Sequence, residues 1–286
     1  MILSVKDLPN LEVLFTRAEL FRKADSRQVW ALCDDSWRSS FKNKYLGCIF
    51  DEPSIRTRWS FTSAFERMGG SVISSFGPGS TSKEKGESLH DMVMTASQYV
   101  DYIVLRQSES LVEYDFNDVD ACVINAGDGN NEHPTQALLD AYTIWREFGR
   151  ISDLNILVVG DVRQSRAIHS LTRLLGDNNQ FTICDVRNKE LWAYDQESLS
   201  KADVLYLNRV QLEREKSESV FSFGEADLLW LNDRAIIMNP GPRCEEMPEF
   251  VDKDPRSRYW QQVKNGMYIR MSLFFHILLE EKLNKA

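Results

Sequence analysis

Short apolar runs alternate along the chain with stretches of helical periodicity. This alternation is typical of parallel sheets covered by helices on both faces. The pattern restarts near the middle of the chain and therefore predicts two α/β halves. We expect strands in the first half at residues 47–50, 72–75, 102–105 and 122–124, and in the second half at residues 156–159, 181–186, 204–207 and 235–238.

The segment after the first predicted strand concentrates hydroxyl and guanidinium groups. Apolar residues then recur at helical spacing, at Phe61, Ala64, Phe65 and Met68. They predict a helix whose first turn spans residues 54–57. The free N–H groups and positive dipole end of that turn attract anions, and Arg56 can add a forked pair of charged hydrogen bonds. We interpret this segment as a phosphate site, with a capped helix and surface arginines as the alternative.

A second polar segment, residues 125–136, lies between an apolar run and another predicted helix. The apolar face of that helix is marked by Leu138, Ala141, Tyr142 and Trp145. Pro134 suits the first helical position, because its missing N–H would have no helical partner there. His133 thus opens a helix beside glycines, where it can donate to a substrate oxygen. A purely structural histidine is the alternative.

Composition and charge narrow the class of protein. With 286 residues, the chain is long enough for two domains. Its net charge of −9 argues against nucleic-acid or lipid partners, so the motif arginines form a local positive site on an acidic protein. Five scattered cysteines show neither zinc nor disulfide spacing, which predicts free thiols in a reducing cytoplasm. We find no signal-peptide core and no membrane-length apolar run.

A nicotinamide dehydrogenase is the main rival for a two-domain α/β chain. Residues 158–163 lack the three-glycine turn that lets a pyrophosphate approach, and a Walker-type lysine loop is missing. The sequence therefore predicts a site that acts on a small anion with no cofactor, neither nucleotide nor metal.

Several motifs together resemble one family. Ser54-Ile55-Arg56-Thr57-Arg58 resembles the Ser-Thr-Arg-Thr-Arg carbamoyl phosphate motif of the aspartate/ornithine carbamoyltransferases, and His133-Pro134-Thr135-Gln136 resembles their His-Pro-x-Gln motif. Residues 81–87 resemble a loop lent by a neighbouring subunit. Residues 104–106 resemble a strand ending in a phosphate-contacting arginine, and residues 259–270 resemble the segment before the last helix. The likeness runs nearly end to end.

The resemblance implies an α/β fold of two Rossmann-like domains with parallel sheets flanked by helices and an active site in the interdomain cleft. Residues 1–133 plus 265–286 would form the carbamoyl phosphate domain, and residues 134–264 the amino-acid domain. The implied reaction moves the carbamoyl group of carbamoyl phosphate to the amine of L-aspartate, a step of de novo pyrimidine synthesis. The products would be N-carbamoyl-L-aspartate and phosphate.

The family pattern also implies residue roles in carbamoyl phosphate binding. The implied binding set is Ser54, Ile55, Arg56, Thr57, Thr81, Ser82, Lys85, Arg106, His133 and Gln136. Within it, the groups expected to act on the reacting atoms are Arg56, Thr57, Lys85, Arg106 and His133. Because Lys85, with Thr81 or Ser82, would come from an adjacent subunit, the resemblance implies a homotrimer with shared sites. Regulatory chains could also attach.

For the acceptor, the family pattern points to the second half. Arginines at the positions of Arg166 and Arg209 hold the two carboxylates of aspartate, with assistance from Gln211 and Lys85. Main-chain carbonyls of Pro240 and Gly241 would hold the attacking amine. Two guanidinium forks favour a dicarboxylic amino acid over ornithine. The resemblance also implies that Glu52 pairs with Arg166 and Arg214 when the domains close.

Several departures from the family pattern leave alternatives open. Ile55 replaces a threonine of the phosphate motif, Asn239 replaces a common histidine, and Glu84 stands where another cation or a glycine is frequent. The second half is also shorter than usual. One alternative is a carbamoyltransferase for a different amino acid, and another is a catalytically silent paralogue that serves as a binding or assembly subunit.

Overall fold

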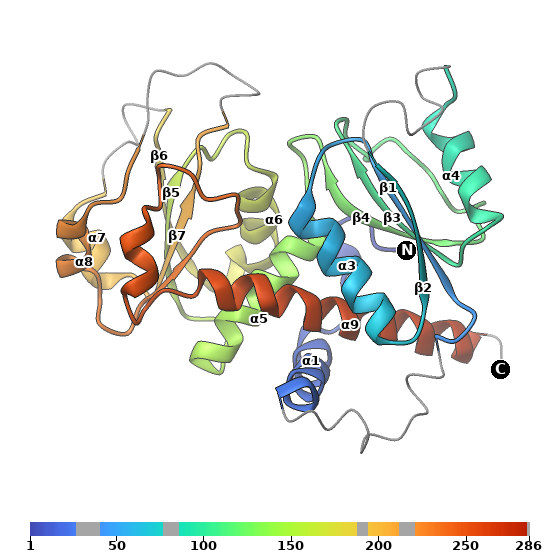
Figure 1. Ribbon diagram of the computed structural model, residues 1–286. Coiled ribbons are helices and arrows are strands. Elements are labelled where there is room, and N and C mark those ends of the chain that lie inside the picture. Colours follow the sequence, from blue (N-terminus) through green and yellow to red (C-terminus); the bar gives the residue numbers. More distant parts are fainter. Residues whose placement is uncertain (27–40, 77–85, 188–193, 212–220, 285–286) are drawn as a thin grey trace. The chain divides into compact units, whose positions relative to one another are not determined.

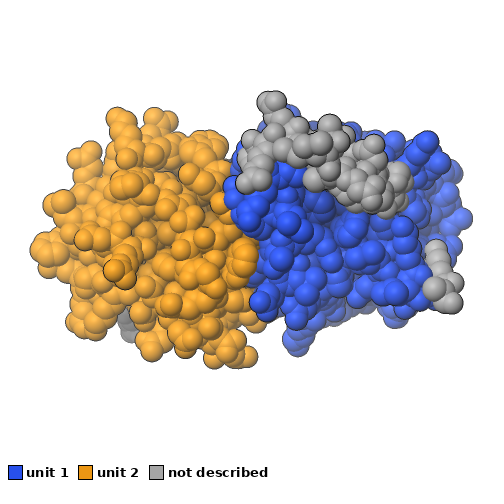
Figure 2. All heavy atoms as spheres, turned by 90° about the horizontal axis from the view of Figure 1, so that it is seen from below, with its two compact units in different colours: residues 1–135, 264–286 blue, residues 136–263 orange. Residues whose placement is uncertain are grey.

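We describe a computed structural model of the chain for residues 1–26, 41–76, 86–187, 194–211 and 221–284. Contacts divide it into two compact units (Figure 2). Unit 1 comprises Met1–Thr135 with Lys264–Ala286, and unit 2 comprises Gln136–Val263. The chain passes between the units within two of its helices, α5 (Pro134–Phe148) and α9 (Tyr259–Asn284).

Unit 1 contains one parallel sheet with the order β2-β1-β3-β4 (Figure 1). Its strands are β1 (Tyr45–Phe50), β2 (Ser71–Phe76), β3 (Tyr102–Gln107) and β4 (Cys122–Asp128). Its helical elements are η1 (Val5–Asp7), α1 (Leu11–Ser26), α3 (Ile55–Arg67) and α4 (Leu89–Ser97), together with the starts and ends of the two helices shared between units.

Side chains of β3 alternate between the two faces of this sheet. Tyr102 packs edge-to-face against Phe65 of α3 and Phe274 of α9, with ring centroids 5.5 and 5.9 Å apart. Ile103, one residue on, belongs to a separate cluster with Val93 of α4. Helices therefore cover both faces of the sheet, as the sequence predicted.

Unit 2 repeats the arrangement with a parallel sheet of order β6-β5-β7-β8. Its strands are β5 (Asn155–Gly160), β6 (Gln180–Asp185), β7 (Val204–Asn208) and β8 (Ile236–Met238). The helices that lie wholly in this unit are α6 (Arg166–Leu175), η4 (Gly176–Asn178), α7 (Gln196–Lys201), α8 (Glu225–Trp230) and η5 (Glu249–Lys253). The unit also contains most of α5 and the first residues of α9.

One face of the unit 2 sheet forms a large apolar cluster. Leu157 and Leu205, on neighbouring strands, pack there with Leu199 of α7. Phe223 and Val251 complete the cluster from the irregular segments that follow. On the opposite face, Tyr206 of β7 reaches Asp140 of α5. Both faces of the second sheet are therefore covered as well.

The predicted fold class is confirmed, and all eight predicted strands are present. One expectation about the end of the chain was wrong. The resemblance placed residues 259–270 before the last helix, but α9 already begins at Tyr259. Gly266 is the strongest helix-disfavouring residue in that stretch, and a single interior glycine costs only about 1 kcal/mol.

Candidate functional site

The predicted phosphate segment lies at the carboxyl edge of the unit 1 sheet. Phe50 and Arg106 are register partners on β1 and β3, and the Asp51 N–H donates to the Arg106 carbonyl at 2.9 Å. The turn before α3 and the side chain of Arg106 therefore occupy neighbouring positions. Parallel α/β sheets bind ligands at this edge.

The first turn of α3 has the features that an anion site requires. Ser54 is its N-cap, in extended backbone conformation, and its hydroxyl does not cap the helix. Thr57 is buried, whereas the Ile55 side chain is 63% exposed. Arg56 follows in the same turn, so main-chain N–H groups, hydroxyls and a guanidinium group gather at one helix end.

Arg106 is held by two acceptors in unit 1. Its Nη2 lies 3.3 Å from Glu52 Oε2, and its Nη1 donates to the Ala126 carbonyl at 3.4 Å. The Arg106 side chain is 14% exposed and that of Glu52 is 22% exposed. The carboxylate fixes the guanidinium group near the α3 turn. The predicted role of Glu52 with Arg166 and Arg214 in closure stays a prediction.

The loop before His133 is fixed by two carboxylates. Asp128 Oδ2 accepts from the Leu111 N–H at 2.8 Å, and its Oδ1 accepts from the Glu132 N–H at 3.0 Å. Glu132 in turn accepts from the Val5 N–H at 2.8 Å. His133 is only 5% exposed and directly precedes α5, which begins at Pro134. The strand before the loop, β4, extends to Asp128 and so is longer than the sequence predicted.

Arg270 of α9 connects α3 with the start of α5 in unit 1. Its Nη1 donates to the Ser60 hydroxyl at 2.6 Å, and its Nη2 donates to the Thr135 hydroxyl at 3.2 Å. The guanidinium carbon also lies 4.5 Å from the centre of the Phe61 ring. This buried arginine therefore fixes α3 relative to the start of α5.

In unit 2, a buried carboxylate ties together the loops after three strands. Asp161, which follows β5, forms an ion pair with Arg187 at 2.8 Å. It also accepts from the Gln211 N–H at 3.1 Å, and the Gln211 carbonyl accepts from Arg187 at 3.2 Å. Gln211 Nε2 donates to the Gln164 carbonyl at 2.9 Å. The segment that carries Arg209 and Gln211 is thereby fixed.

The ends of β5 and β7 are in close contact at the carboxyl edge of the unit 2 sheet. A Cβ atom on Gly160 would lie 2.0 Å from the Asn208 carbonyl oxygen, and the φ of Gly160 is +145°, so a side chain cannot replace it. The Ser165 hydroxyl donates to Asn208 Oδ1 at 3.2 Å. Ser165 also caps α6, whose first residue is Arg166, and Arg166 is only 8% exposed.

The predicted amine-binding turn follows β8. Asn239 Oδ1 accepts from the Gly241 N–H at 2.6 Å, and its Nδ2 donates to Glu246 Oε1 at 2.8 Å. The Gly241–Pro242 peptide bond is cis, and Gly241 has a φ of +68°. The Asn239 side chain thus holds the N–H of the Pro240–Gly241 peptide group, whose carbonyl is that of Pro240.

The predicted site residues divide between the two units. In unit 1, Ser54, Arg56, Thr57, Arg106 and His133 lie at or beside the carboxyl edge of the sheet. Gln136, Arg166, Arg209, Gln211, Pro240 and Gly241 belong to unit 2. Thr81, Ser82, Lys85 and Arg214 lie outside the described residues.

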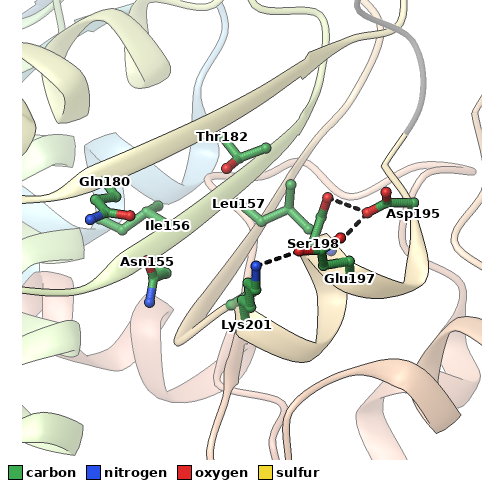
Figure 3. Close-up of a pocket in the computed structure, with 10 residues that line it drawn as sticks. Asn155, Ile156, Leu157, Gln180, Thr182, Asp195, Glu197, Ser198 and Lys201 are labelled. Carbon is green, nitrogen blue, oxygen red and sulfur yellow. Dashed lines mark hydrogen bonds and ion pairs between the residues drawn. The ribbon is translucent and has the colours of Figure 1, made fainter.

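Figure 3 shows a pocket in unit 2 whose lining contains none of these residues. Its lining includes Asn155 and Gln180, the first residues of β5 and β6, and the α7 pair Glu197 and Lys201. It therefore lies at the amino edge of the sheet. Ligands of parallel α/β sheets bind at the opposite edge, so we do not assign the reaction to this pocket.

Several residues that support the site were missed in the sequence. They are Asp140, Arg187, Tyr206 and Gln262. Asp140 had a detectable signal, because it lies four residues after Gln136 on a predicted helix. The others act across long sequence separations, which periodicity does not report.

Two α/β units whose carboxyl edges gather guanidinium groups are typical of enzymes that act on small anionic substrates. The carbamoyl phosphate-binding domain model of the aspartate/ornithine carbamoyltransferases matches residues 1–146, and the aspartate/ornithine-binding domain model matches residues 187–277. The chain belongs to the aspartate/ornithine carbamoyltransferase family. Both the predicted family and the predicted enzyme class are confirmed.

Relatives support the same conclusion. The aspartate carbamoyltransferase catalytic subunit of Methanothermobacter thermautotrophicus is 37% identical, over 98% of this chain and 96% of its own length. The aspartate carbamoyltransferase catalytic subunit of Vibrio cholerae serotype O1 is 39% identical, over 84% of this chain and 86% of its own length. The aspartate transcarbamoylase of Trypanosoma cruzi, solved with carbamoyl aspartate and phosphate, has a TM-score of 0.85 at 28% identity, covering 96% of this chain and 94% of that one.

Two features are absent from the described part of the chain. No helix there is long and apolar enough to cross a membrane. The same residues contain no group of three or more His, Cys, Asp or Glu side chains that could hold a metal ion.

Proposed function

We propose that this chain transfers the carbamoyl group of carbamoyl phosphate to the amine of L-aspartate, giving N-carbamoyl-L-aspartate and phosphate. The observation that carries the proposal is the register of Phe50 with Arg106, which sets that guanidinium group beside the α3 turn. Solved relatives with carbamoyl phosphate, with aspartate and with N-(phosphonacetyl)-L-aspartic acid support this choice of substrates.

In the proposed ground state, unit 1 holds the phosphate. The main-chain N–H groups of the α3 turn, the hydroxyls of Ser54 and Thr57, and the guanidinium groups of Arg56 and Arg106 surround it. Ile55 contributes its N–H only. As the bond from carbamoyl carbon to phosphate oxygen breaks, charge builds on the phosphate, and these donors stabilise it.

The carbamoyl group itself is oriented by a second set of residues. His133, Thr57 and Arg106 polarise the carbonyl oxygen, and Gln136 accepts from the carbamoyl nitrogen. The aspartate amine attacks the carbonyl carbon directly, so no covalent enzyme intermediate forms. The attacking nitrogen loses a proton, and phosphate leaves with the bonding electron pair.

Unit 2 supplies selectivity for the acceptor. Arg166 and Arg209 bind the two carboxylates of aspartate, assisted by Gln211, whose backbone the Asp161 carboxylate fixes. Carbonyls of Pro240 and Gly241 accept from the amine and aim it at the carbamoyl carbon. We propose residues 1–133 with 265–286 as the carbamoyl phosphate domain and residues 134–264 as the aspartate domain.

We also propose a cytoplasmic homotrimer with shared sites. Lys85, with Thr81 or Ser82, would reach the site of a neighbouring copy and contact both substrates. Mixing two inactive proteins tests this arrangement, one with Arg56→Ala and the other with Lys85→Ala. After subunit exchange, hybrid trimers should regain part of the activity, because some sites then receive neither substitution. Failure to regain activity in verified mixed trimers would exclude sharing.

Phosphate release in the presence of a panel of amino acids tests the reaction. Release that depends on carbamoyl phosphate and aspartate supports the proposal. Release with a different amine would instead indicate another acceptor. Absence of release with every amine, by folded protein that still binds phosphate, would indicate a silent paralogue.

A further inference from the structure

Asp140 of α5 is fully buried within unit 2 and accepts hydrogen bonds from the side chains of Gln136, Gln262 and Tyr206. Its Oδ1 accepts from Gln136 Nε2 at 3.0 Å and from Gln262 Nε2 at 2.6 Å. Its Oδ2 accepts from the Tyr206 hydroxyl at 2.7 Å. A carboxylate in this position draws donors from α5, α9 and β7 to one point.

The Asp140 carboxylate fixes the orientation of the Gln136 and Gln262 side-chain amides. An ionised carboxylate only accepts, so each glutamine must present its NH₂ group to Asp140 and turn its carbonyl oxygen elsewhere. The second amide agrees with this rule, because Gln262 Oε1 accepts from the Asn239 N–H at 3.0 Å. In the same orientation, the Gln136 side-chain oxygen can accept a hydrogen bond from a ligand N–H.

The second branch of the network reaches the predicted amine-binding turn. Gln262 fixes the backbone of Asn239, and the Asn239 side chain accepts from the Gly241 N–H. Glu246 fixes the amide of Asn239 in the same manner, by accepting from its NH₂ group. Two carboxylates thus orient three amides, and the chain of contacts runs from Gln136 to Gly241 without leaving unit 2.

The surroundings of Tyr206 keep its hydroxyl protonated. Burial raises the pKa of Tyr206 well above its ordinary value, and the Asp140 charge and hydrogen bond raise it further. The hydroxyl therefore keeps its proton and remains a donor to the carboxylate.

We propose that Asp140 is a positioning residue for carbamoyl transfer, acting on the carbamoyl group through Gln136 and on the attacking amine through Gln262 and the Asn239 turn. The inference rests on the proposed function, because it takes the roles of Gln136 and of the turn from it. Asp140 itself touches neither substrate. Its effect is to supply the charge that orients the two amides.

Asp140→Asn tests the first branch. An asparagine either keeps weaker, uncharged bonds or turns its own NH₂ group toward the glutamines, so Gln136 loses its fixed orientation. We expect kcat to fall about tenfold or more, within the coupling range of groups in one network. The dissociation constant for inorganic phosphate, measured by calorimetry, should stay within about twofold, since phosphate binds in unit 1.

A double-mutant cycle separates positioning from a general structural role. If Asp140 acts partly through Gln136, Asp140→Asn should lower kcat, measured at saturating aspartate, by a smaller factor in a Gln136→Ala background than in the wild type, because only the Gln262 branch then remains to be disturbed. Asp177→Asn, an exposed substitution in the same unit, provides the matched control and should leave kcat unchanged. An equal kcat loss in both backgrounds would overturn the first branch.

Gln262→Met tests the second branch. It also provides an alternative test if the Asp140→Asn protein does not fold. It removes the bond to Asn239 while keeping side-chain length, so the KM for aspartate should rise several-fold with unchanged phosphate affinity. Unchanged KM in Gln262→Met, or unchanged kcat in Asp140→Asn, in an enzyme whose wild type is active with aspartate would refute the inference. A wild type inactive with aspartate would instead refute the proposed function.

Discussion

Glu52 Oε2 lies 3.3 Å from Arg106 Nη2, so the arginine that we assign to the phosphate already has an anionic partner. The pair spans the ends of two neighbouring strands and is partly exposed. A phosphate entering the site must therefore share or replace this carboxylate.

Glu52→Gln should tighten the binding of inorganic phosphate. The substitution removes a negative charge near the anion and releases Arg106 from a partly exposed ion pair, whose strength is at most about 1 kcal/mol. We expect the dissociation constant, measured by isothermal titration calorimetry, to fall by up to about fivefold. Weaker phosphate binding would show that Glu52 mainly holds Arg106 in place.

Ile55→Thr should improve carbamoyl phosphate binding. The Ile55 side chain is 63% exposed at the first turn of α3, so replacing it leaves the core intact. A hydroxyl donor at that position should add about 0.5 to 1.5 kcal/mol, seen as a KM for carbamoyl phosphate about twofold to tenfold lower. Ile55→Val is the control, because valine has the shape of threonine but no hydroxyl. An equal effect of both substitutions would argue against a hydroxyl contact.

Arg187→Leu should destabilise unit 2 and weaken aspartate binding. The substitution leaves Asp161 buried without its ion-pair partner, and breaking a buried pair in this way costs about 3 to 5 kcal/mol. Denaturant unfolding measures the loss, and the KM for aspartate should rise because Gln211 loses its support. Adding Asp161→Asn removes the buried charge and should recover part of the stability. Failure of the double variant to recover any would exclude the charge as the cause.

Thiol reactivity should differ among the cysteines. Burial raises the pKa of Cys48 to about 12 and that of Cys184 to about 11, so neither forms much thiolate near neutral pH. Cys244 is exposed. Brief alkylation at neutral pH, followed by mass spectrometry, should therefore modify Cys244 far faster than Cys48 or Cys184. Denatured protein is the control, in which all three react. Fast labelling of Cys48 in folded protein would contradict its burial.

Local patterns predicted the fold well. The apolar face of α3 and the proline at the start of α5 sufficed to place Ser54 and His133 at helix starts, because both features act within a few residues. Strand ends were less well predicted. The sheet extends β4 to Asp128 through pairing with Gln107, a distant partner that periodicity does not reveal.

The supporting residues of the site could not be predicted in the same way. Gln262 meets Asp140 across 122 positions of sequence, and Arg187 meets Asp161 only after two strands are paired. From the sequence alone, polar side chains like these would be predicted to lie on the surface. Their burial follows from tertiary packing, which brings each donor to an acceptor.

In the proposed mechanism, Arg56 and Arg106 hold carbamoyl phosphate for transfer to aspartate. The most direct test of this mechanism is to quantify carbamoyl aspartate and phosphate together, for wild type and for Arg106→Lys, which keeps the charge and loses the fork. Wild type should form the two products in equal amounts, and Arg106→Lys should be about 10²- to 10³-fold slower. Phosphate without carbamoyl aspartate from wild type, or an Arg106→Lys enzyme of normal rate, would contradict the account.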